Sequence, residues 1–102
     1  MKVTLYRPGQ KPEDVPAAAF TTHLESSQIV QDVEHAARLL ECTPNLVDVL
    51  ACGVGYIAYS IFYYEGESNS TAMEAVAAIS GTELDLTNED EVLQGPVLIV
   101  VA

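Results

Sequence analysis

The alternation of apolar and polar residues near the N-terminus predicts a first strand over residues 2–6 (KVTLY), with Val3 and Leu5 on one face. The next segment, residues 7–14, contains two prolines and a glycine and is typical of a turn. Near the other end of the chain, residues 96–101 (PVLIVV) are apolar without interruption. Continuous apolar sequence predicts an interior strand that is covered on both faces.

Two more strands are predicted between these. Residues 55–64 are rich in tyrosine and largely apolar on both faces, so this strand is either central and covered twice or covered by a second subunit. Residues 82–86 (TELDL) alternate and predict the fourth strand. The aromatic residues that we assign to the core or to a homodimer interface are Tyr56, Tyr59, Phe62, Tyr63 and Tyr64.

Apolar residues at helical spacing predict two main helices. The first covers residues 26–41 and is capped by one of the two serines at 26–27. The second covers residues 70–80, with a capping box formed by Thr71 and Glu74.

A shorter helix over residues 44–51 is predicted from the Thr-Pro start signal that precedes it. Together these elements predict one α+β domain over residues 1–102, with a mostly antiparallel sheet of about four strands and two main helices packed on it.

The net charge of the chain limits the classes of partner that the domain can bind. Fifteen acidic residues face four basic ones, giving a formal net charge of -11. Nucleic acid needs basic side chains on its phosphates, and anionic membranes also attract basic segments, so we expect neither as a direct partner. A basic protein surface is the natural partner, because opposite charges accelerate the encounter. The alternative is that the acidity serves solubility alone.

The acidic residues gather near the C-terminal strand. The partner-binding surface that we predict consists of Glu65, Glu67, Glu83, Asp85, Glu89, Asp90 and Glu91. Some of these carboxylates could instead belong to a helical turn over residues 87–94, where the free amides of a first turn stabilise negative charge.

The sequence does not contain the residue spacing expected of a metal site or of a catalytic nucleophile. The histidines and cysteines, His23, His35, Cys42 and Cys52, match no zinc-site spacing. On one helix, His35 and Cys42 would be two turns apart, about 10.5 Å, which is beyond hydrogen-bond reach. The glycine pattern at residues 53–58 (GVGYIA) resembles a dinucleotide fingerprint, but the tyrosine-rich segment after it favours a strand where that fold needs a helix. We therefore expect no catalytic residue, metal or cofactor.

The expected location is the cytoplasm of a bacterial host cell. Residues 49–64 are uncharged but shorter than the ~20 residues that a membrane-spanning helix needs. The N-terminus has no apolar region typical of a signal peptide, so we expect Cys42 and Cys52 to be reduced thiols.

Short segments resemble one family of uncharacterised proteins. They are residues 1–13 (MKVTLYRPGQKPE), residues 61–68 (IFYYEGES) followed by Asn69 and Ala72 at the start of a helix, and residues 95–102 (GPVLIVVA). Together they resemble the small phage and bacterial proteins of domain-of-unknown-function family 3846. The resemblance implies no activity and no functional residue, and it suggests a phage or mobile-element setting.

Two classes of function are consistent with these observations. In the first, the protein is a non-enzymatic inhibitor or adaptor whose carboxylates stand in for DNA phosphates. It would bind a basic surface of a host nucleic-acid-binding or defence protein. In the second, it is a small ligand-binding module or enzyme with a pocket beside the tyrosine-rich strand. Steep salt dependence is expected of the first class and not of the second with a neutral ligand.

Overall fold

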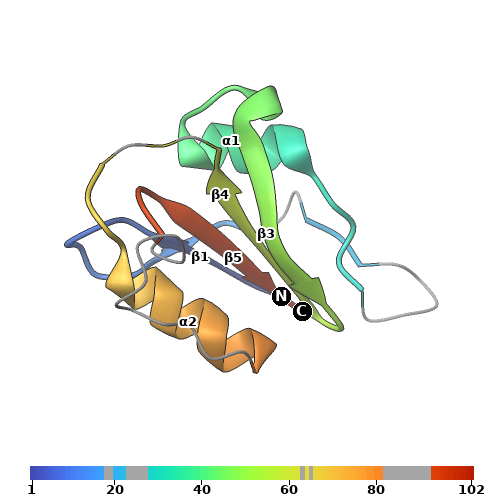
Figure 1. Ribbon diagram of the computed structural model, residues 1–102. Helices are drawn as coiled ribbons and strands as arrows, with labels where there is room; N and C mark the ends of the chain where they lie inside the picture. The colour runs from blue at the N-terminus through green and yellow to red at the C-terminus, as the bar shows by residue number, and fades with distance from the viewer. Residues whose placement is uncertain (18–19, 23–27, 63, 65, 82–92) are drawn as a thin grey trace.

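An antiparallel sheet of five strands, in the order β2-β1-β5-β4-β3, forms the centre of the computed structural model (Figure 1). The structure describes residues 1–17, 20–22, 28–62, 64, 66–81 and 93–102. The strands are β1 (Lys2–Tyr6), β2 (Glu13–Val15), β3 (Val47–Gly53), β4 (Tyr56–Ile61) and β5 (Val97–Val101). The predicted α+β class is confirmed, with five strands among the described residues in place of about four.

The C-terminal strand β5 lies inside the sheet, as its continuous apolar sequence predicted. It pairs with β1 on one side and β4 on the other, and the residues from Val97 to Val100 are all buried. Because Lys2 is opposite Val101, the two ends of the chain lie side by side (Figure 1).

The tyrosine-rich strand β4 is central and covered on both faces. Ile57 and Tyr59 belong to the core on one face of the sheet, and Ala58 belongs to the core on the other. Both backbone edges of β4 are already paired, with β3 and with β5. Strands of the same chain thus occupy both backbone edges of β4 over Tyr56–Tyr59, and the predicted homodimer interface stays a prediction.

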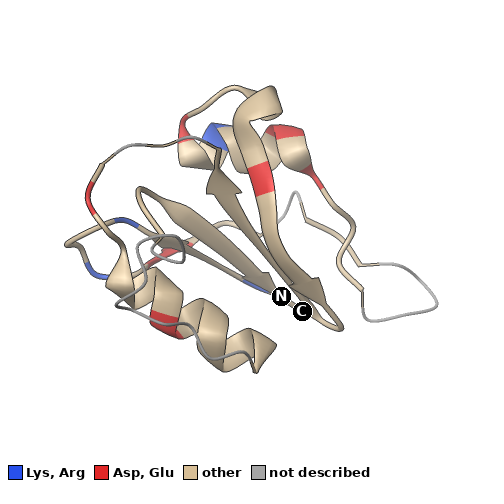
Figure 2. Cartoon of the chain, viewed as in Figure 1, with Lys and Arg blue, Asp and Glu red and all other residues tan. Residues whose placement is uncertain are grey.

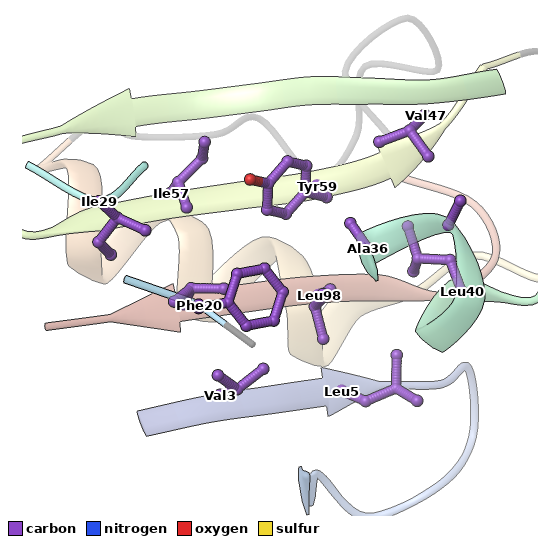
Figure 3. Close-up of a cluster of buried hydrophobic side chains, with 12 residues drawn as sticks. Val3, Leu5, Phe20, Ile29, Ala36, Leu40, Val47, Ile57, Tyr59 and Leu98 are labelled. Carbon is purple, nitrogen blue, oxygen red and sulfur yellow. The ribbon is translucent and has the colours of Figure 1, made fainter. Parts of the chain in front are cut away.

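Helix α1 (Val33–Leu40) covers the first face of the sheet (Figure 3). Ala36, Ala37 and Leu40 pack against strand residues that include Leu98 and Tyr59. The other large members of this core are Val3, Leu5, Phe20, Ile29, Val47 and Ile57.

The first helix is shorter than predicted. Residues 28–32 are not helical, and Ile29 forms a bridge with Thr22. The helix begins at Asp32, whose side chain accepts a hydrogen bond from the His35 amide at 3.0 Å. The Asp32 amide donates to the Tyr59 hydroxyl at 3.1 Å, which holds this residue at the sheet rather than inside a helix. Burial raises the pKa of the Tyr59 hydroxyl.

Helix α2 (Ser70–Ser80) covers the opposite face. Ala72 and Val76 pack with Ala58, Val97 and Ile99, and in Figure 3 the helix lies behind the sheet. It has the predicted bounds of residues 70–80.

The cap of α2 is not the predicted one. Asn69 is the N-cap, and Thr71 and Glu74 lie inside the helix, so the predicted capping box is wrong. Asn69 precedes the first turn, where a short polar side chain can reach a free amide.

The remaining predictions lie between the main elements. The helix predicted over residues 44–51 is wrong: a single 3₁₀ turn, η1 (Pro44–Leu46), leads directly into β3. The first four residues of β3 include Val47 and Val49, whose β-branched side chains favour a strand. Strand β2 forms within the segment that was predicted as a turn. The strand predicted over residues 82–86 lies outside the described residues.

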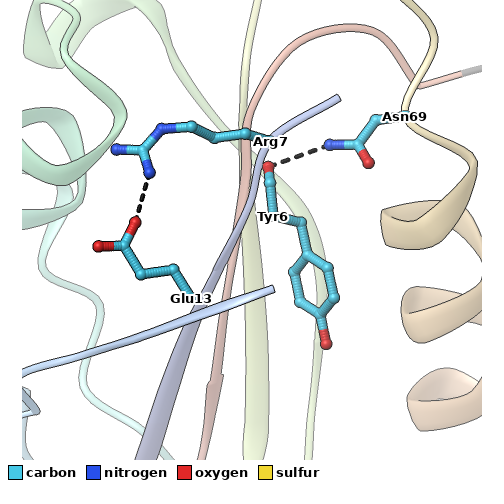
Figure 4. A network of polar contacts seen from close by, with 4 residues as sticks. All are labelled: Tyr6, Arg7, Glu13 and Asn69. Atoms are coloured by element: carbon cyan, nitrogen blue, oxygen red, sulfur yellow. Dashed lines mark hydrogen bonds and ion pairs between the residues drawn. The ribbon is translucent and has the colours of Figure 1, made fainter. Parts of the chain in front are cut away.

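The buried side chain of Asn69 joins three separate segments. Figure 4 shows its contact with the Tyr6 carbonyl. Its Nδ2 donates to the carbonyl oxygens of Tyr6 at 3.0 Å and Gly95 at 2.9 Å. Its Oδ1 accepts from the Ala72 amide at 3.2 Å. One amide group therefore fixes the end of β1, the approach to β5 and the start of α2.

We expect Asn69→Ala to lower the free energy of unfolding by about 3 kcal/mol, because it removes a helix cap and leaves two carbonyls without their donor. Asn69→Ser is the matched variant: it retains a capping oxygen and should recover about 1 kcal/mol. Urea denaturation followed by circular dichroism measures both. A loss below about 0.5 kcal/mol for the alanine variant would contradict this role.

Candidate functional site

A cleft of about 630 Å³ opens at one end of the sheet. At this end β1 and β4 finish and β5 begins, so the segments that leave and enter these strands form its walls. The volume falls within the range of small-molecule and peptide-side-chain pockets. We call this site the sheet-end cleft.

Apolar side chains line much of the sheet-end cleft: Pro8, Leu39, Leu40, Leu46, Ile61 and Pro96. Leu46 is 36% exposed, and its carbonyl accepts a hydrogen bond from the amide of Phe62, which is 44% exposed. The cleft lining therefore includes an apolar side chain, Leu46, that is open to solvent, and exposed apolar surface is a feature of interaction sites.

One wall of the cleft is the ring of Tyr64, which is 42% exposed. The ring lies against the backbone of Gly66 and Gly95, and a Cβ atom at either glycine would overlap it. Gly95 also has a φ of 75°, a conformation that favours glycine. The two glycines thus allow the aromatic ring to rest directly on the chain.

The cleft lining also contains polar residues, and the charge left without an ion pair among the described lining residues is negative. The guanidinium of Arg7 is bound by the carboxylate of Glu13 (Figure 4). Neither Glu41 nor Glu67 has an ion-pair partner among the described residues. The Glu67 carboxylate lies beside Gly9, where an added Cβ atom would be 3.8 Å from Oε2. The other polar lining residues are Gln10, Cys42 and Thr43.

Glu41 has an unusual backbone conformation. It ends α1 in the left-handed region, with φ 61° and ψ 43°, and its amide donates to carbonyls of the last helical turn. Glycine is the residue most often found there, because a Cβ atom makes this conformation unfavourable. Glu41 therefore lines the cleft from a position where a side chain costs stability.

Glu41→Gly should raise the free energy of unfolding by about 0.5–1 kcal/mol, because it relieves the left-handed conformation. Glu74→Gly, inside α2, makes the same substitution at a helical position and should lower it by about 1 kcal/mol. Denaturant unfolding measures both variants. A destabilised Glu41→Gly would contradict the strain that we assign to this residue.

Of the predicted acidic surface, the structure describes one member. Glu67 is exposed and lies at the cleft. The other six predicted residues lie outside the described part of the chain: Glu65, Glu83, Asp85, Glu89, Asp90 and Glu91. The described carboxylates are spread over β2, α1, β3, α2 and the connecting segments (Figure 2). Within the described ranges they do not form a single surface.

The predicted aromatic residues have different environments. Tyr59 is fully buried in the core, and Tyr56 is half-buried with its ring over Gly53. Phe62 and Tyr64 are exposed near the sheet-end cleft, and Tyr63 lies outside the described residues. The strand thus contributes to the core along its length and to the cleft region beyond its end.

The cysteines and the described histidine show no shared site. His35 packs edge-on against Phe20, with ring centroids 5.0 Å apart. Burial raises the pKa of the Cys42 thiol, which disfavours the thiolate that a nucleophile needs. Among the residues that the structure describes, no three His, Cys, Asp or Glu side chains are grouped as metal ligands.

We expect a disulfide-exchange reagent to modify exposed Cys52 before half-buried Cys42 at about pH 8. In the Cys52→Ser variant, the rate at which Cys42 is labelled should keep rising with pH above about 8.5. The reason is that burial raises the pKa of the Cys42 thiol, so the thiolate forms at higher pH. Absorbance of the released thiol measures both rates, with Cys42→Ser as the control. Faster modification of Cys42 would contradict its protected environment.

In the described part of the chain, no helix has the length and apolar character needed to cross a membrane.

Comparisons with known proteins return no relative. No family model, no curated protein and no solved structure matches the chain. The resemblance to domain-of-unknown-function family 3846 therefore stays a prediction.

Sequence reasoning missed most of the cleft. Arg7, Leu46 and Pro96 come from three separate segments that only the sheet order brings to one end. One local signal was present: the sequence has no glycine where α1 ends, and Glu41 takes the position that glycine usually occupies.

Proposed function

We propose that this protein is a non-enzymatic interaction protein that binds a basic surface of another protein. The observation that carries this proposal is the net charge of -11, combined with few ion pairs among the residues that the structure describes. In the described ranges, the ion pairs are Lys2 with Asp14 and Arg7 with Glu13. The other described carboxylates keep their charge available to a partner.

The physical basis is long-range attraction. One exposed ion pair contributes about 0–1 kcal/mol, so no single carboxylate would carry the interaction. The summed field of many carboxylates steers a basic partner and accelerates association. The interaction should therefore weaken as salt shortens the screening length.

The proposed partner is a host nucleic-acid-binding or defence protein, which the protein inhibits or modulates in a bacterial cytoplasm. The resemblance to a phage and bacterial family supports this setting. A basic channel built for DNA is the kind of surface that clustered carboxylates would occupy in place of phosphates.

A second candidate function, a small-molecule-binding module, is favoured by the sheet-end cleft. The cleft adjoins the end of the tyrosine-rich strand at Ile61 and Tyr64, and its volume suits a small ligand. Binding of a neutral ligand there would depend little on salt, which separates the two candidates.

To test the proposed function, proteins captured from a bacterial lysate are identified, and direct binding of each purified candidate is measured by biolayer interferometry. Affinity should fall at least tenfold between about 50 mM and about 300 mM salt. Replacing the acidic residues Glu83, Asp85, Glu89, Asp90 and Glu91 with lysine should abolish binding. Glu34→Lys changes one isolated carboxylate on α1 and is the control.

Two results would contradict the proposal. One is a captured partner whose affinity is unchanged when the five acidic residues are neutralised. The other is the absence of any salt-sensitive partner when the protein is folded.

A further inference from the structure

We infer that the sheet-end cleft docks a short peptide segment of a partner protein, in which a large apolar side chain lies next to a lysine or arginine. This inference rests on the proposed function and deepens it, because it names the surface and the chemistry of the bound segment. Three features of the cleft support it: exposed apolar surface, carboxylates that have no ion-pair partner within the described ranges, and walls held by hydrogen bonds and packing in the free protein.

The apolar part of the cleft provides the anchor. Leu46 and Tyr64 are 36% and 42% exposed and line it together with half-buried Ile61 and Pro96. An incoming apolar side chain would cover this surface and remove it from water, which is the main source of binding free energy in such a groove.

The charge of the cleft lining selects a cation beside that anchor. Arg7 is the basic residue of the lining, and Glu13 already binds its guanidinium. Glu41 and Glu67 also line the cleft and have no ion-pair partner among the described residues. A lysine or arginine would complement these two carboxylates, whereas an acidic segment would meet them as like charges.

The walls of the cleft are fixed before any segment binds. Asn69 holds the carbonyl oxygens of Tyr6 and Gly95, the residues that directly precede Arg7 and Pro96. The Tyr64 ring rests on glycine backbone, and Glu41 is held in its left-handed conformation at the end of α1. Groups that are ordered in the free protein lose little entropy on binding.

A substitution of Glu41 can distinguish a role in binding from a role in stability, because this residue has a left-handed backbone conformation. If its side chain were there for structure alone, glycine would serve better at this position. Glu41→Gly should therefore give a folded protein that binds the segment less tightly. A loss of binding in this variant cannot be attributed to unfolding.

The test uses a library of random decapeptides displayed on phage, selected on the immobilised full-length protein. Enriched peptides should combine at least one large apolar residue with at least one lysine or arginine. Representative peptides are then synthesised with a fluorophore, and fluorescence anisotropy gives their affinity for the wild type and for each variant.

Leu46→Asn should weaken peptide binding at least tenfold, because it places a polar group in the apolar part of the cleft. The matched control is Val54→Asn, at a turn residue that is 79% exposed between β3 and β4. Combining Glu41→Gly with Glu67→Gln should weaken binding several-fold and reduce its salt dependence. Glu74→Gln, on α2, is the matched control, and both controls should bind within twofold of the wild type.

Three results would overturn the inference: no enrichment, enriched peptides that lack the basic or the apolar residue, or Leu46→Asn binding within twofold of the wild type. Its failure can be distinguished from failure of the proposed function. A salt-sensitive protein partner that binds Leu46→Asn normally overturns the cleft as the docking site and leaves the proposed function standing. If peptides bind in the cleft but no salt-sensitive protein partner is found, the proposed function is overturned and the cleft stands as a peptide-docking site.

Discussion

The arrangement of the sheet end depends on the side chain of Asn69, which is 1% exposed. It donates to two carbonyl oxygens on different segments and accepts the amide that begins α2. Its backbone contributes as well, because the Asn69 amide donates to the Leu93 carbonyl at 2.8 Å. A buried amide that satisfies every one of these groups is specific to one geometry, since a small displacement would leave them unpaired.

The hydrogen bonds of Asn69 explain the position of the cleft. The sheet buries apolar side chains on both faces through α1 and α2. Beyond Ile61, the cleft is lined by connecting segments and by Leu39 and Leu40 at the end of α1. Asn69 holds two of those segments in place. The lining of the cleft combines apolar side chains with the acidic residues Glu41 and Glu67, which suits a basic and apolar partner better than a purely electrostatic one.

The sequence predicted the parts of the fold that depend on local pattern. The bounds of α2 and the interior position of β5 followed from apolar spacing and from an uninterrupted apolar run. The start of α1 did not follow from local pattern. It depends on the hydrogen bond between Asp32 and Tyr59, which are far apart in the chain. Residues 44–51 show the same limit, since pairing with β4 decides their conformation more than the preceding start signal does.

The candidate site was less predictable than the fold. The tyrosine-rich strand β4 ends beside the cleft, but Tyr59 is core, and the exposed aromatic residues among those described are Phe62 and Tyr64. Acidic composition predicted a partner class without showing which carboxylates meet an apolar surface. Glu67 was among the predicted residues, whereas Glu41 was not, because its role depends on the backbone conformation at the end of α1.

If the hydrogen bonds around Asn69 hold the cleft walls in the free protein, the backbone amides there should be protected from hydrogen exchange, which NMR measures. The amides to follow are those of Asn69, which donates to Leu93, and Gly95, which donates to the Glu67 carbonyl at 3.0 Å. The account predicts that both exchange as slowly as the amides of β5, through global unfolding. Exchange as fast as that of the exposed turn at Val54 would contradict a preformed cleft.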